Sequence, residues 1–178
     1  MAKLIVDFAY HRVLLGTAES QAEEHQHPIA IVTAQMALEV RVEEAFTTLF
    51  SLRDGLPVAE LVALLPDRTM MQTSVKRLWE ALTGDRISKA SAWSEYQRHV
   101  ERRNRLAHGS EQWSNHRQAE ASLAAVTGMI EHIDRVVAAA IAGARPILAE
   151  PIRHESGAHT KRTSTKSATD SSAGGLPS

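Results

Sequence analysis

The sequence predicts an all-α protein, a bundle of about five helices followed by a disordered C-terminal tail. Turn formers and strand formers are both scarce, because 178 residues include 9 glycines and 6 prolines and only 4% are aromatic. Long segments also carry apolar residues at steps of three and four, the spacing of one helix face. The chain has no cysteine, which excludes disulfides, thiolate metal sites and a cysteine nucleophile.

Composition divides the chain into a predicted folded domain, residues 1–148, and a predicted tail, residues 149–178. Of the 28 residues from Pro151 to Ser178, 13 are Ser, Thr or Gly, and few are large and apolar. Such a segment buries too little apolar surface to offset its conformational entropy, so we expect it to be disordered.

The clearest helix is predicted over residues 118–143. Ser114 is the expected N-cap, and Pro146 follows the end. One apolar stripe runs along this helix: Ala119, Leu123, Val126, Ile130, Ile133, Val137 and Ile141.

A second long helix is predicted over residues 28–52, with Pro28 in the first turn. Its main apolar stripe consists of Ile31, Ala34, Leu38, Val42, Ala45, Leu49 and Leu52. Four further apolar residues widen this face: Ile29, Val32, Met36 and Val40. So wide a face predicts the central helix of a bundle.

Shorter helices are expected over residues 57–65, 69–82 and 88–107. Gly84 and Gly109 end the last two. The helix over 88–107 carries its apolar residues on one side: Trp93, Tyr96, Val100 and Ala107. We expect the two aromatic residues to be core rather than base-stacking residues. The first 25 residues are predicted as helix, with a short strand at 4–6 as the alternative.

Charge and hydropathy limit the classes of function. The formal net charge is −1, so any binding to a polyanion depends on a local patch. No apolar run approaches the ~20 residues of a membrane span, and the N-terminus lacks the apolar core of a signal peptide. We expect a soluble, cytoplasmic protein with no membrane association.

The local patch is the segment 98–108, which holds four arginines and two histidines against one acid, Glu101. Within it, Arg103 and Asn104 flank the line set by the apolar residues, where an unpaired charge is costly. Asn104 and His108 are four residues apart and share a helix face. Arg103 and His108 are five apart and diverge, so only the helix end at Gly109 or a second copy of the motif brings them together.

The run Arg103-Asn104-Arg105-Leu106-Ala107-His108 resembles the Arg-x(4–6)-His motif of the HEPN superfamily, in which a polar residue, often Asn, follows the Arg. The layout of long helices over roughly residues 25–145 is similar too. The resemblance implies an all-α bundle, frequently a homodimer, and in many members a metal-independent endoribonuclease. Many members act as toxins or in defence, often beside a nucleotidyltransferase-like antitoxin.

The chemistry of RNA cleavage fits these residue types. Attack by the ribose 2′-hydroxyl needs a base, an acid for the leaving oxygen and fixed positive charge on the phosphate. We expect His108 to be the acid/base group, Arg103 the phosphate-binding cation and Asn104 a supporting hydrogen bonder, all three in the catalytic site. Arg98, Arg102 and Arg105 are the expected RNA-backbone contacts. No cofactor or metal is expected.

Two alternatives remain open. The first is a non-catalytic HEPN-like module that binds a nucleotide, a phosphate or a protein partner, and the second is an unrelated bundle whose motif faces solvent. The pair His25 and His27 favours a solvated cap before Pro28 over a metal site. The other histidines are interpreted as surface or boundary residues: His11, His99, His116 and His132.

Overall fold

The computed structural model describes residues 9–52, 69–110 and 113–144. These residues form only helices and connecting turns, which confirms the all-α fold class. The helices are α1 (Tyr10–Glu23), α2 (His27–Ser51), α4 (Thr73–Thr83), the short 3-10 helix η1 (Ile87–Lys89), α5 (Trp93–Ala107) and α6 (His116–Gly143). The predicted helix over 57–65, the strand alternative at 4–6 and the predicted tail lie outside the described residues.

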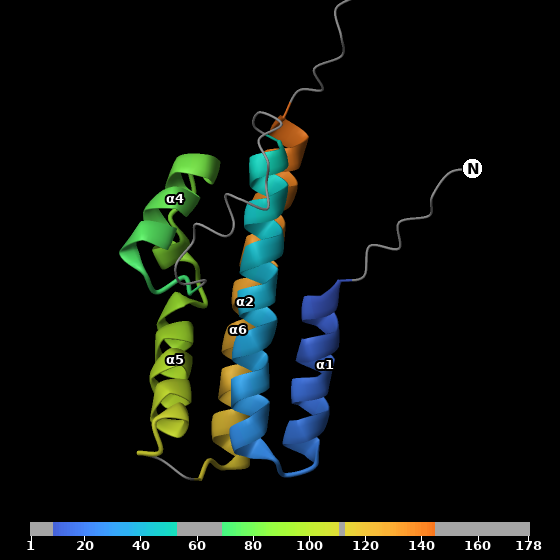
Figure 1. Cartoon of the computed structure of the whole chain (residues 1–178), viewed down its shortest axis with the longest axis vertical. Coiled ribbons are helices and arrows are strands. Elements are labelled where there is room, and N and C mark those ends of the chain that lie inside the picture. The colour runs from blue at the N-terminus through green and yellow to red at the C-terminus, as the bar shows by residue number, and fades with distance from the viewer. Residues whose placement is uncertain (1–8, 53–68, 111–112, 145–178) are drawn as a thin grey trace, which may run out of the picture. The chain divides into compact units, whose positions relative to one another are not determined.

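The chain divides into two compact units, residues 1–145 and 146–178, and all described residues belong to the first. In this unit the two long helices α2 and α6 pack against each other (Figure 1). Helix α1 packs on α2 and α6, and α5 packs on the same two helices from another side. Helix α4 also contacts both of them. The apolar stripes predicted for the two long helices therefore meet at the centre of the bundle.

The buried core combines residues from each of the described α-helices. The aromatic residues Trp79, Trp93, Tyr96 and Phe46 are buried, which confirms that Trp93 and Tyr96 belong to the core. A smaller apolar cluster, which we call the end cluster, joins Ala22, Ala30, Ile31 and Ala119, with Leu106 and Leu123 packed against it. The end cluster ties the last turns of α1 and α5 to the first turns of α2 and α6.

Three predicted helix starts are wrong by a few residues. Helix α4 begins at Thr73 rather than at 69, and α5 begins at Trp93, since Ile87–Lys89 forms a separate 3-10 turn. The N-cap of α6 is Asn115, not Ser114. Its side chain accepts from the backbone of Gln118, and the Gln118 side chain accepts from the backbone of Asn115. This reciprocal capping box satisfies two backbone donors at once, which Ser114 cannot do one residue earlier.

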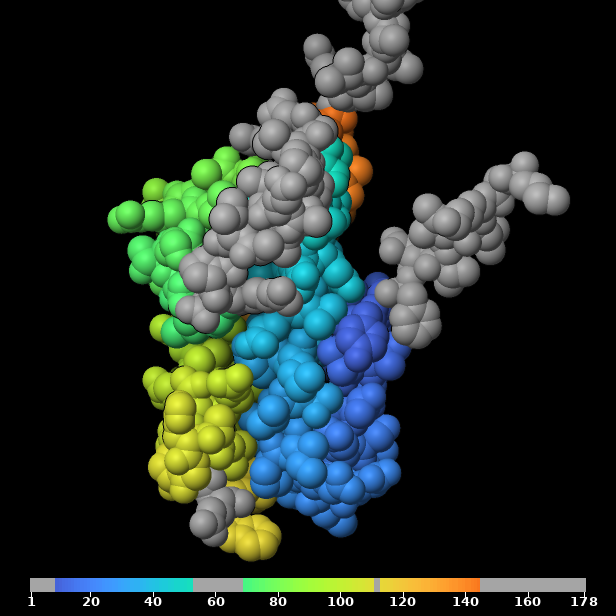
Figure 2. All heavy atoms as spheres, in the orientation of Figure 1, coloured from blue at the N-terminus to red at the C-terminus, as the bar shows by residue number. Residues whose placement is uncertain are grey.

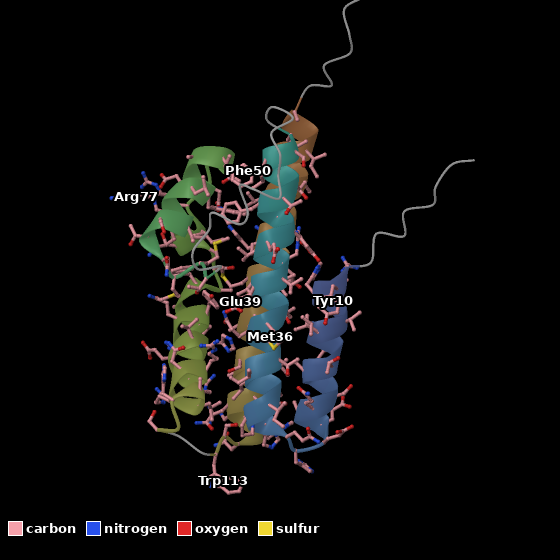
Figure 3. All side chains as sticks on the ribbon, in the orientation of Figure 1. Tyr10, Met36, Glu39, Phe50, Arg77 and Trp113 are labelled. Atoms are coloured by element: carbon pink, nitrogen blue, oxygen red, sulfur yellow. The ribbon has the colours of Figure 1, made fainter. Side chains whose placement is uncertain are left out.

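Helix α2 contacts α1, α4, α5 and α6, as expected for a central helix. The residues that widen its apolar face are not buried within the chain, however, because Ile29 is 51% and Met36 49% exposed. Figure 2 shows the surface of α2 between α1 and α5, and Met36 is labelled on it in Figure 3. The apolar face of α2 is thus wider than its own chain covers.

Residues near helix ends also depart from the predicted stripes. Ala107, placed on the apolar side of α5, is exposed, and so are Leu52 and Ile141 at the ends of the two long helices. Among the described residues no helix is both long and apolar enough to cross a membrane.

Candidate functional site

The candidate site lies at the C-terminal end of α5, where the helix stops at a glycine. Gly109 has φ 69°, a left-handed conformation that glycine adopts without steric cost. Its N–H donates to the Leu106 carbonyl at 3.2 Å, and the N–H of Ser110 donates to the Arg105 carbonyl at 3.0 Å. These two bonds form a Schellman motif. The sequence prediction that Gly109 ends this helix is confirmed.

His108 is the C-cap residue of α5, with φ −92° and ψ 5°, and it is exposed. Its backbone N–H donates to the Asn104 carbonyl at 3.0 Å, so the two residues lie on one face of the last turn. Leu106 belongs to the end cluster, which includes residues from the first turns of α2 and α6. His108 therefore stands at the end of the bundle where α2 and α6 begin (Figure 1).

Arg103 and Asn104 are brought into contact by the structure. The Arg103 guanidinium donates from NH1 to the Asn104 side-chain oxygen at 3.2 Å. Arg103 is half-buried and Asn104 exposed. The buried Nε of Arg103 makes no hydrogen bond to the described residues. The motif thus presents the guanidinium of Arg103, which is hydrogen-bonded to Asn104, and the exposed imidazole of His108. No described contact joins these two side chains.

The three arginines predicted to contact the RNA backbone differ in environment. Arg98 pairs with Glu95 at 2.7 Å in the exposed part of α5. Arg105 is exposed in the last turn. Arg102 is half-buried, and its NH1 donates to the Gln118 carbonyl and to the Ser122 hydroxyl of α6. Arg102 therefore holds α5 against α6, a structural role that the sequence prediction did not include.

His99 was interpreted as a surface or boundary residue, and this is wrong, because it is 0% exposed. Its Nε2 lies 3.1 Å from the side-chain oxygen of Gln35 on α2, and the Gln35 amide donates to Glu39 at 2.8 Å. Burial lowers the pKa of His99 to about 4, and the charges of Arg102 and Arg103 act in the same direction. His99 is therefore neutral at physiological pH.

The neutral ring of His99 has a defined tautomer. Nε2 carries the proton and donates to Gln35, which leaves Nδ1 as a bare, buried acceptor without a described partner. Tyr96 stacks on this ring at a centroid distance of 6.1 Å, and burial raises the pKa of its hydroxyl. Arg103 follows His99 by one helical turn. The helical turn before the motif therefore belongs to a buried group of polar side chains between α2 and α5. This group exists only because the two helices, far apart in the sequence, pack together.

His11 is the second histidine that was interpreted as a surface or boundary residue and is instead buried. It is 5% exposed, and its Nδ1 lies 2.6 Å from the Glu44 carboxylate on α2. His132 lies 2.9 Å from Asp85 through Nε2. Both contacts join segments far apart in the sequence, so spacing alone did not indicate them.

Three further histidines of the described residues, His25, His27 and His116, gather at the same end of the bundle as His108. The rings of His25 and His27 are 5.7 Å apart, and those of His27 and His116 are 5.5 Å apart. His116 also pairs with Glu120 at 3.0 Å. Within the described residues no group of three or more His, Asp or Glu side chains could hold a metal ion.

Trp113 is a further residue at this end that the sequence prediction did not single out. It lies between the end of α5 and the Asn115 cap and is 83% exposed (Figure 3). Trp79 and Trp93 are buried. Trp93 was predicted as a core residue from the apolar side of its helix, whereas no such pattern includes Trp113, so the exposure of Trp113 is shown only by the structure.

Comparison with known proteins gives no family or function for this chain. No protein-family model, no curated protein and no solved structure matches this chain.

Proposed function

We propose that the protein is a metal-independent endoribonuclease of HEPN type that acts in the cytoplasm as a homodimer. The observation that carries this proposal is the last turn of α5, where an exposed imidazole, His108, shares a face with Asn104, which accepts from Arg103. An exposed histidine and a held guanidinium are the two groups that phosphodiester cleavage through the 2′-hydroxyl needs.

The proposed reaction begins when an imidazole takes the proton of the ribose 2′-hydroxyl. The 2′-oxygen then bonds to the adjacent phosphorus, the bond to the 5′-oxygen breaks, and a second acid gives that oxygen a proton. The products are a 2′,3′-cyclic phosphate and a free 5′-hydroxyl. Arg103 stabilises the charge that develops on the phosphate oxygens, and Asn104 holds Arg103 in place. One chain supplies one His108, so a second copy supplies the other imidazole.

The exposed apolar stripe of α2 supports self-association of the chain, in a contact separate from the one that would bring two His108 side chains together. A two-fold axis near Val32 brings Ile29 of one copy against Met36 of the other, since these residues lie on opposite sides of Val32 along the helix. The same axis places Glu39 opposite the start of α2 in the other copy, where His25 and His27 lie. Burial of Ile29 and Met36 then accounts for the width of the apolar face.

A cysteine placed at the axis tests this interface, because the chain has no native cysteine. Under oxidation, Val32→Cys is expected to form a covalent dimer, whereas Tyr10→Cys, an exposed position on α1, is expected to remain monomeric. Equal cross-linking at both positions, or none at Val32, contradicts the α2 interface.

The cleavage assay uses single-stranded RNA and a chelator of divalent metals. His108→Ala is expected to lower the rate by about 10²- to 10⁴-fold, the usual contribution of a general acid or base. His116→Ala is the matched control, an exposed histidine at the same end, and is expected to cleave as the wild type does. Equal rates for wild type and His108→Ala remove His108 from the mechanism.

A second pair of variants tests the cation. Arg103→Met is expected to abolish measurable cleavage, and Arg86→Met, which removes an exposed pair with Glu80 away from the motif, is expected to retain it. RNA binding without cleavage in the wild type favours the non-catalytic module instead.

The same proposal includes a cellular role. The protein would act as the toxin of a toxin–antitoxin or defence system, with a nucleotidyltransferase-like antitoxin as its partner. Induced expression is expected to arrest growth, and His108→Ala is expected to relieve the arrest. Arrest that persists in the His108→Ala strain contradicts the toxin role.

A further inference from the structure

The loop after α5 exposes a tryptophan beside the candidate site. Trp113 is 83% exposed, more than any other large hydrophobic residue of the described part of the chain, and the other two tryptophans are core residues. Trp113 follows His108 by five residues, so their Cα atoms are at most about 18 Å apart. An indole in this position lies within reach of a short stretch of RNA that contacts His108.

Two ordered helix ends flank the segment that carries Trp113. The Schellman motif at Gly109 fixes the exit from α5, and the capping box of Asn115 and Gln118 fixes the entry into α6. Trp113 stands two residues before that cap. The indole therefore lies in the short segment between the end of α5 and the start of α6.

The electrostatic surroundings favour a nucleic acid at this end. Arg105 in the last turn of α5 and Arg117 in the first turn of α6 are both exposed, one on each side of the loop. Positive charge holds a phosphate backbone, and an exposed aromatic face stacks on an unpaired base. Glu120, the acidic residue one turn into α6, contacts His116 at 3.0 Å.

We propose that Trp113 stacks on an unpaired nucleobase and is the base-binding residue of this site. The ligand class is single-stranded RNA, because the bases of a duplex are already stacked on one another and offer no free face. Stacking on an indole tolerates every base, so Trp113 contributes affinity and strand preference rather than sequence specificity. This inference rests on the proposed ribonuclease function and adds the residue that holds the base.

Tryptophan fluorescence of the full chain tests the proposal, because Trp113 is the exposed tryptophan and the other two are buried. The probe is a short 2′-O-methyl single-stranded RNA, which lacks the attacking hydroxyl and is not cleaved. Titration is expected to quench the emission in a saturable way. The same sequence as a duplex is expected to leave the emission unchanged.

Variants separate stacking from general binding. Trp113→Ala is expected to weaken binding of the single strand by about tenfold or more, measured by fluorescence anisotropy of a labelled probe. Trp113→Phe keeps an aromatic face, so it is expected to retain most of the affinity while losing the quenching signal. Tyr10→Ala is the matched control, an exposed aromatic residue on α1, and is expected to bind as the wild type does.

The outcomes distinguish this inference from the nuclease proposal. Unchanged binding by Trp113→Ala, together with cleavage that depends on His108, overturns the role of Trp113 alone. Saturable quenching without cleavage supports Trp113 and overturns the nuclease. Equal quenching by duplex and single strand overturns base stacking, and absence of any RNA binding overturns both proposals.

Discussion

Gly109 forms the turn that ends α5 directly after His108, so it affects both the stability of this end of the bundle and the position of His108. Gly109→Ala is therefore a quantitative test of the site. The residue has φ 69°, and a Cβ built there meets no atom within 4 Å. The cost is therefore backbone strain alone, about 1–2 kcal/mol for an L-residue in the left-handed region. The reduced entropy of the unfolded chain returns about 0.4–1 kcal/mol, which leaves a net loss of about 1 kcal/mol.

For a chain of this size, that loss corresponds to a decrease in Tm of about 2–4 °C, measured by circular dichroism. Gly84→Ala is the matched control, because Gly84 has φ 73° and the same open space but lies far along the chain from the motif. Both variants are expected to lose the same stability. Only Gly109→Ala is expected to lower RNA cleavage, since it alters the turn that places His108.

The comparison has two outcomes that contradict this reasoning. A loss of several kcal/mol at Gly109 alone shows that the end of α5 makes packing contacts beyond the Schellman motif. Equal cleavage by Gly109→Ala and Gly84→Ala shows that the position of His108 does not depend on this turn. Gly109→Asn is expected to recover part of the stability, because Asn tolerates the left-handed region.

Three further variants test the packing that supports the site. Arg102→Met is expected to destabilise the protein by about 2–4 kcal/mol in urea unfolding, because it removes charged hydrogen bonds to α6. Arg98→Met is the control and is expected to leave the unfolding midpoint unchanged, because it removes only an exposed ion pair. A Cβ at Gly128 lies 2.9 Å from the Cβ of Ala92, so Gly128→Ala is expected to cost about 1–3 kcal/mol, and Ala92→Gly in the same chain is expected to restore part of it. The pKa of His99 is lowered to about 4, so the unfolded chain binds more protons than the native one between about pH 4 and 6.5. Stability is therefore expected to fall by about 3 kcal/mol as the pH falls through this window, and His99→Gln is expected to remove that dependence; an identical slope in the variant contradicts the assignment.

Periodicity predicted the long helices well because each carries a continuous apolar stripe. The end of α5 was also predictable, since Gly109 is the residue type that the turn requires. The starts of α4, α5 and α6 were less certain, because several residues near each start can serve as caps. Asn115 prevails over Ser114 since Gln118 completes the reciprocal bonds. Such a choice depends on side-chain geometry rather than on residue type.

The candidate site was predictable only in part. The motif residues and their shared turn follow from spacing on one helix, as the Asn104–His108 bond illustrates. The buried state of His99 could not be predicted from spacing, because its partner Gln35 comes from a helix 64 positions away in the chain. Nor could the exposure of Trp113, since a tryptophan in a sequence is more often a core residue.

By itself, the amino-acid sequence determined the helical class, the extents of the long helices, the glycine stop and the cationic run that ends in His108. These features depend on contacts within one helix, where three or four residues set the geometry. The tertiary structure decided which arginine holds α6, which histidines are buried, and which apolar residues of α2 remain uncovered. Each of these depends on which neighbouring helix lies opposite, and local spacing carries no information about that neighbour.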